Sequence, residues 1–177
     1  EHNVSKELLH RMSQYIEYAL DHQKRSVAAV DVRLLSLLSE PLYEELQKEI
    51  YEPHFQDHPL FKKLCKFYAV AMRSVCASAV TTMFLAPRDL LFRPRQVAGR
   101  MFFIVGGTLC YDKDGKVQSI ECPSYFSEAV LWTPWLFLGL MEASTPTELV
   151  ALASDEFAEA IKMHPVTFTR VKRYATH

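Results

Sequence analysis

Residues 101–120 read MFFIVGGTLCYDKDGKVQSI, and this stretch decides the fold class. Residues 101–105, 108–111 and 117–120 are short runs rich in apolar, β-branched and aromatic side chains, a composition that favours strands. Gly106-Gly107 and the segment 112–115 (DKDG) separate these runs and are typical of tight turns. The stretch therefore predicts three short strands joined by turns.

The same pattern extends in the N-terminal direction, where residues 80–84 (VTTMF) form another β-rich run and Pro87 and Pro94 interrupt the chain. Many short strands at close intervals indicate a β-barrel or jelly roll. Thr145-Pro146-Thr147-Glu148 has the pattern of a helix-capping box.

Two helices are predicted after the strands. Ser154 is expected to cap the first of them. Asp155 and Glu156 follow it, and acidic side chains are favoured at the positive, N-terminal end of the helix dipole. Pro165 ends that helix and begins the second, because proline is tolerated in the first helical turn only.

The first 60 or so residues predict helices. Ser5 is a candidate cap for a first helix, whose apolar residues recur at helical spacing: Leu8, Met12, Tyr15, Ile16 and Ala19. A second helix carries Val30, Leu34, Leu35, Leu37 and Leu38 and ends near Glu40, because Pro41 disfavours helix in the residue before it. Pro41 opens a third helix with Leu42, Leu46 and Ile50, and Pro53 and Pro59 bracket a short helical piece. Such short amphipathic helices are expected to pack on a neighbouring domain or a second subunit.

The overall composition is that of an ordinary globular protein. The 177 residues are 49% hydrophobic and 23% charged with a net charge of −1, so nucleic acid is not an expected partner. The longest apolar stretch, residues 130–141, contains Pro134 and is shorter than the roughly 20 residues that a membrane span needs. Cys65, Cys76, Cys110 and Cys122 form no CxxC pair and are expected to be free, mostly buried thiols.

The order of these parts resembles the C-linker and cyclic-nucleotide-binding domain of hyperpolarization-activated and cyclic-nucleotide-gated channels and their voltage-gated potassium channel relatives. The resemblance covers nearly the whole chain. Its motifs, in chain order, are residues 4–18, residues 38–46, residues 59–61, Pro87-Arg88-Asp89, residues 101–107, Ser124-Tyr125-Phe126-Ser127-Glu128, Glu148-Leu149 and Asp155-Glu156-Phe157.

The resemblance implies an α+β chain with a helical C-linker at residues 1–60 and a jelly-roll-like β-roll with flanking helices at residues 61–177. It implies a gating module on the cytoplasmic side of a membrane, in a tetrameric cation channel that is potassium-selective or weakly selective. The expected partners are the other subunits, through a ring of linker helices, and the transmembrane pore.

The resemblance also locates a ligand pocket, at Phe126, Ser127, Glu128, Ala129, Val130, Trp132, Trp135 and Phe137. The family binds a cyclic phosphate there with a Gly-Glu pair and an arginine. Here Ser127 replaces the glycine, Glu128 is kept, and Phe137 stands at the arginine position; residues 128–139 contain no basic residue. A charge-assisted contact contributes about 1.5–3 kcal/mol, or about 10- to 100-fold in affinity. We therefore expect weak or no binding of cAMP or cGMP and no other cofactor.

Several alternatives stay open at this point. The aromatic residues of the pocket either fill it as core or line an apolar site for another ligand or for a segment of the channel itself. His54 and His58 are spaced for zinc on a helix but are interpreted as solvated. Arg88, Arg93, Arg95 and Arg100, like Arg170, Lys172 and Arg173, either meet an acidic partner or form a solvated face.

The function classes that compete with a channel module are a soluble cyclic-nucleotide sensor of the kinase regulatory subunit type and a purely structural assembly module. The sensor predicts a phosphate-binding arginine and no linker. No nucleophile–base signature, P-loop or paired carboxylates in a recognisable frame occur, so an enzyme is not expected.

Overall fold

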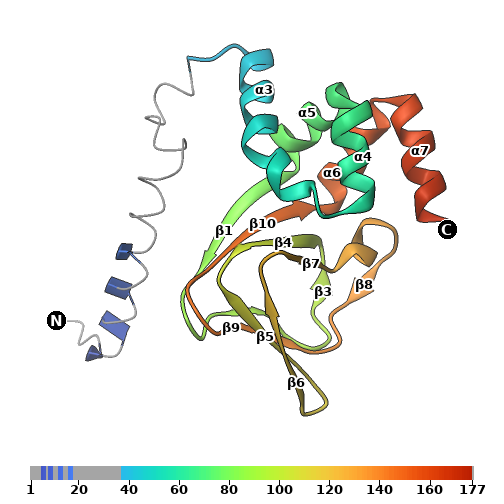
Figure 1. The fold of residues 1–177 in the computed structure, drawn as a ribbon. Coiled ribbons are helices and arrows are strands. Elements are labelled where there is room, and N and C mark those ends of the chain that lie inside the picture. The colour runs from blue at the N-terminus through green and yellow to red at the C-terminus, as the bar shows by residue number, and fades with distance from the viewer. Residues whose placement is uncertain (1–4, 7, 10–11, 14–15, 18–36, 177) are drawn as a thin grey trace.

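The computed structural model describes residues 37–176 and, before them, residues 5, 6, 8, 9, 12, 13, 16 and 17 (Figure 1). It confirms the α+β class: helices come first, antiparallel sheets follow, and two helices close the chain. Figure 1 shows helices α3 to α7 gathered at one end of the strands. None of the helices in the described part of the chain is long and apolar enough to span a bilayer.

Four helices precede the sheets in the described residues 37–78, and all but the last of them carry a proline in the first turn. They are α3 (Glu40–Tyr51), the 3-10 helix η2 (Glu52–Phe55), α4 (Pro59–Phe67) and α5 (Ala69–Ser78). Pro41 lies in the first turn of α3, as predicted. The Ser5 hydroxyl accepts a hydrogen bond from the Leu8 N–H at 3.2 Å, which confirms the predicted cap. The predicted helix over residues 30–38 lies largely outside the described residues, and Leu37 and Leu38 lie in a turn and a bend.

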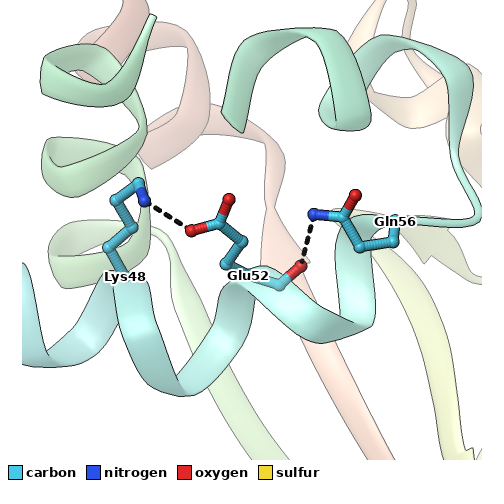
Figure 2. A network of polar contacts seen from close by, with 3 residues as sticks. All are labelled: Lys48, Glu52 and Gln56. Atoms are coloured by element: carbon cyan, nitrogen blue, oxygen red, sulfur yellow. Dashed lines mark hydrogen bonds and ion pairs between the residues drawn. The ribbon is translucent and has the colours of Figure 1, made fainter. Parts of the chain in front are cut away.

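A polar network holds α3 to η2. The Lys48 ammonium forms an ion pair with the Glu52 carboxylate, and the Gln56 side chain donates to the Glu52 carbonyl oxygen at 3.3 Å (Figure 2). The hydrogen bond to Glu52 raises the pKa of Lys48, although partial burial opposes that shift. α3 also packs against α5, so residues 40–51 are attached to the helices that cover the sheets. The expected boundary between residues 60 and 61 falls inside α4, and the division into two domains stays a prediction.

Ten strands follow: β1 (Val80–Leu85), β2 (Leu90–Phe92), β3 (Val97–Ala98), β4 (Arg100–Gly106), β5 (Thr108–Lys113), β6 (Lys116–Glu121), β7 (Ser124–Phe126), β8 (Trp135–Leu136), β9 (Leu140–Ala143) and β10 (Thr147–Ala153). They form two four-stranded antiparallel sheets, ordered β1-β10-β4-β7 and β2-β9-β5-β6, and the pair β3-β8. The strand predictions at residues 80–84, 101–105, 108–111 and 117–120 are confirmed.

Two turns explain why these strands pair in this register. Asp114 and Gly115 have φ values of 55° and 76°, the left-handed pair that closes a two-residue hairpin between β5 and β6. The Asp112 carboxylate accepts from the Gly115 N–H at 3.1 Å and fixes this turn. At Gly107, φ is 86° and a Cβ would lie 2.3 Å from the Pro146 carbonyl oxygen, so glycine is required there.

Aromatic rings join the helices to the first sheet. Phe61 of α4 is fully buried, and its ring centroid lies 5.8 Å from that of Phe103 in β4 and 5.7 Å from that of Phe157. Phe55 of η2 contacts the same Phe103 ring at 5.0 Å. Helices and sheet therefore share one core, stabilised by ring contacts as well as by burial.

The closing helices are α6 (Ser154–Lys162) and α7 (Pro165–Ala175). Asp155 and Glu156 occupy the first turn of α6 and Pro165 begins α7, as predicted. The predicted cap is wrong by one residue. Ala153 is the N-cap and Ser154 is already helical, with no side-chain cap, because β10 runs directly into α6 without a loop.

Candidate functional site

A pocket of about 280 Å³ opens between the second sheet, the end of β7, the 3-10 helix η3 (Glu128–Leu131) and β8. Its lining is mostly aromatic and aliphatic: Phe92, Tyr111, Ile120, Phe126, Ser127, Glu128, Ala129, Trp135, Phe137, Leu138 and Met141. Six of the eight predicted pocket residues lie in this lining. The exceptions are Val130, which is buried in the core, and Trp132, whose ring packs against Phe157 and Tyr174 of the closing helices.

Phe137 is the residue at the position of the missing arginine. Its ring stacks on that of Phe92 with centroids 3.6 Å apart and planes 2° from parallel, and only 7% of its surface is exposed. Backbone hydrogen bonds with Gln96 and Arg95, at 3.0 and 2.8 Å, fix this segment. Phe137 is thus part of the core. Trp135 is 37% exposed, so the aromatic residues fill only part of the space and a pocket remains.

The pocket offers an anion no positive charge. Among the residues that the structure describes, its lining contains no lysine, arginine or histidine, and Glu128 is its one carboxylate. Arg95 is bonded to Phe137 through its backbone N–H, but its side chain is exposed and lies outside the lining. η3 is a single 3-10 turn, too short to provide the dipole and the row of free N–H groups of an α-helix.

Ser127 precedes η3 with φ 64° and ψ 28°, in the left-handed region. Glycine adopts this region without strain, whereas a side chain costs about 1–2 kcal/mol. The backbone at this position therefore keeps a conformation suited to glycine, although the residue is a serine.

The Glu128 carboxylate is turned toward the helices. One of its oxygens lies 3.1 Å from His58 Nε2, and the other accepts a hydrogen bond from Trp132 Nε1 at 3.4 Å. Tyr174 of α7 also bonds this carboxylate; burial, followed by the negative charge of Glu128, raises the pKa of the Tyr174 phenol. Glu128 thus connects η3 to the start of α4 and to α7.

His58 is completely buried, so the interpretation of this residue as solvated is wrong. Its Nδ1 accepts a hydrogen bond from the Leu60 N–H at 3.2 Å and caps α4, which places the proton of the neutral ring on Nε2, facing Glu128. Burial lowers the pKa of His58, and the contact with Glu128 opposes this only in part. The predicted site did not include His58, Phe92 or Tyr174. For His58 the sequence did carry a signal, because this residue directly precedes Pro59, which can open a helix and leaves His58 at the cap position.

The remaining candidates lie away from the pocket. His54 is half-buried, and among the described residues no group of three or more potential metal ligands occurs. Arg88, Arg93, Arg95 and Arg100 are all exposed, as are Arg170, Lys172 and Arg173. All four cysteines are free. Cys65 and Cys76 are buried, which raises their pKa values to about 11 and about 12, and Cys110 is half-buried; Cys122 is the exposed exception to the expectation of mostly buried thiols.

Comparison with known proteins gives no matching protein-family model and no matching curated protein. The function must therefore be argued from the residues and the geometry.

Proposed function

We propose that this chain is a regulatory module of a tetrameric cation channel on the cytoplasmic side of a membrane. In this proposal residues 1–60 form a C-linker that joins its neighbours in a four-fold ring below a pore that is selective for potassium or weakly selective. Residues 61–177 form a degenerate cyclic-nucleotide-binding-type β-roll whose position biases the ring. The proposed partners are the other subunits and the transmembrane pore.

One observation carries the proposal: a pocket at the end of Ser124–Phe126 and η3 in which a glycine-type backbone conformation directly precedes Glu128 and no cation occurs among the described lining residues. Ser127 adopts a glycine-type conformation directly before Glu128. Phe137, at the arginine position of the resemblance, is stacked into the core. The closing helices contact η3 through Trp132 and through the Glu128 carboxylate. This arrangement supports an inherited ligand-sensing architecture that has lost its anionic ligand.

The same observation argues against the soluble cyclic-nucleotide sensor, since that class needs a cation in the pocket. It leaves a structural assembly module as the second candidate. Exposed apolar side chains on the described N-terminal helical residues, 46–49% exposed at Leu8, Leu9, Met12 and Ile16, favour a surface that pairs with another subunit in either case.

Sequencing the gene upstream of Glu1 separates the channel from the assembly module. Six hydrophobic spans with a pore loop between the last two support the channel. A different upstream architecture, such as a kinase-anchoring segment or another soluble domain, contradicts it. If the spans are present, recording the current in excised patches tests whether the roll still affects the gate when residues 61–177 are deleted.

The first prediction concerns nucleotides. Calorimetric titration of the chain with cAMP or cGMP is expected to give no binding tighter than about 1 mM, because the phosphate would enter an apolar pocket without a cationic partner. Titration with a nucleoside lacking the phosphate is the matched control, and it is expected to bind no more weakly than the cyclic nucleotide. A micromolar dissociation constant for either cyclic nucleotide would contradict the proposal.

A further inference from the structure

We propose that the pocket binds a small, flat, uncharged aromatic molecule. This inference deepens the proposed function by naming the ligand class of the same site. It depends on the geometry of the pocket and not on the presence of a pore.

Space is the first argument. A cavity of roughly 150 Å³ lined by apolar side chains accepts one benzene ring, and this pocket measures about 280 Å³. A molecule of about two fused rings therefore fits. The pocket is also open to solvent, because Trp135 and Leu138 in its lining are 37% and 55% exposed, so a ligand can enter without unfolding the chain.

The shape of the lining is the second argument. Phe92 and Phe137 stack face to face with their ring centroids 3.6 Å apart, and the rings of Tyr111 and Phe126 stand tilted against Phe92 at 6.5 and 6.3 Å. All four of these residues line the pocket. A lining of aromatic rings favours a planar aromatic guest over a branched aliphatic one, because a guest ring gains stacked or edge-to-face contacts in addition to its buried area.

Charge is the third argument, and it disfavours both kinds of ion. Within the described part of the lining, an anion meets one carboxylate and no cation. A cation would need that carboxylate, but both oxygens of Glu128 already face donors, His58 Nε2 at 3.1 Å and Trp132 Nε1 at 3.4 Å. A ligand cation at Glu128 would compete with these contacts, which hold η3 to the helices. The uncharged ligand is the one that leaves these contacts intact.

The two tryptophans provide a direct test, because Trp135 lines the pocket and Trp132 packs outside it. Each indole N–H gives its own signal in a nitrogen–proton correlation spectrum of the labelled chain, and Trp132→Phe assigns them. The probes are naphthalenemethanol, naphthalenesulfonate and naphthylmethylammonium, which share one ring system and differ in charge. The neutral probe is expected to shift the Trp135 signal saturably below about 1 mM and at least about tenfold more tightly than the sulfonate.

Two exposed leucines give matched variants. Leu138→Asp places a charge in the lining and is expected to weaken the neutral probe about tenfold or more, whereas Leu136→Asp, at a 49% exposed residue outside the lining, should leave its affinity unchanged. Equal affinity for the three probes, no shift of Trp135, or equal effects of the two variants would overturn the inference. Those results leave the channel proposal standing, while a soluble upstream architecture would remove the channel and leave the ligand site.

Discussion

Replacing Phe61 by alanine is expected to destabilise the chain by about 3–5 kcal/mol, the usual cost of removing a fully buried phenylalanine. Phe61 is 0% exposed and contacts the rings of Phe55, Phe103 and Phe157, which belong to η2, β4 and α6. The cavity would therefore open where three elements meet. Because this is where the first helices join the sheet and the closing helix, loss of stability is expected to be cooperative.

The same helix supplies the control. Phe67 ends α4 and is 66% exposed. Phe67→Ala therefore deletes the same ring atoms at a solvent-exposed position and is expected to change stability by less than about 0.5 kcal/mol. Urea unfolding of the two variants, followed by circular dichroism, measures the difference. If Phe61→Ala lost less than about 1 kcal/mol, or if the helices melted separately from the sheets, the shared core would be disproved.

The strands were predictable because their information is local. Residues 112–115 contain an Asp and a Gly at the two positions that must adopt positive φ, so the β5–β6 hairpin follows from turn chemistry alone. Strand β4, which precedes β5 in the chain, has a continuous apolar run, and the burial of residues 101–104 agrees with that pattern. Pro41 and Pro165 likewise define helix starts, because the constraint of proline on the backbone does not depend on tertiary structure.

The pairings that complete the sheets could not be predicted in this way. β4 lies between β7 and β10, and β9 lies between β2 and β5. These neighbours come from distant parts of the chain and are selected by packing, for which a single sequence carries no direct signal. Helix α5 was missed for a related reason, since its apolar residues become informative only once α3 and α6 pack against it.

For the site, the sequence predicted the absence of positive charge around Glu128. This prediction needed only the composition of residues 128–139, which include no basic residue. It did not predict where the carboxylate points. His58 lies 70 residues before Glu128, and its burial depends on α4 closing over the first sheet. Trp132 faces the helices rather than the pocket because the short turn of η3 directs neighbouring side chains to different sides.

The buried His58 also gives the chain a pH-dependent stability. The pKa of this side chain is lowered in the fold, mainly by burial, so below about pH 6.5 the unfolded chain takes up the proton before the folded chain does. Stability is therefore fully present above about pH 6.5 and is lost as the pH falls toward the lower pKa of the folded state. Each unit between the two pKa values corresponds to about 1.4 kcal/mol. Protonation would also place a hydrogen on Nδ1, which now accepts from the Leu60 N–H.

The groups that surround His58 determine which other side chains can contribute to the pH dependence of stability. Glu128 of η3 faces its Nε2, Tyr174 of α7 shares that carboxylate, and the Tyr125 ring of β7 lies 4.5 Å from the imidazole. Burial also lowers the pKa of His54, so His54 adds a dependence of the same sign. The contribution of His58 must therefore be isolated by substitution.

The variant His58→Asn isolates the contribution of His58 to the pH-dependent stability. Asparagine is a good helix cap and can accept from the Leu60 N–H, but it does not titrate and is too short to keep the contact with Glu128. At about pH 7.5 this variant is expected to lose about 1–3 kcal/mol, the cost of an unpaired, partly buried partner. Between about pH 7.5 and pH 5.5 its stability should fall less than that of the parent chain. Tyr174→Phe removes a different contact of Glu128 and keeps the histidine, so its stability should fall with pH as steeply as the parent's. Equal slopes for His58→Asn and the parent chain in urea unfolding at the two pH values would show that the imidazole carries no proton-linked stability.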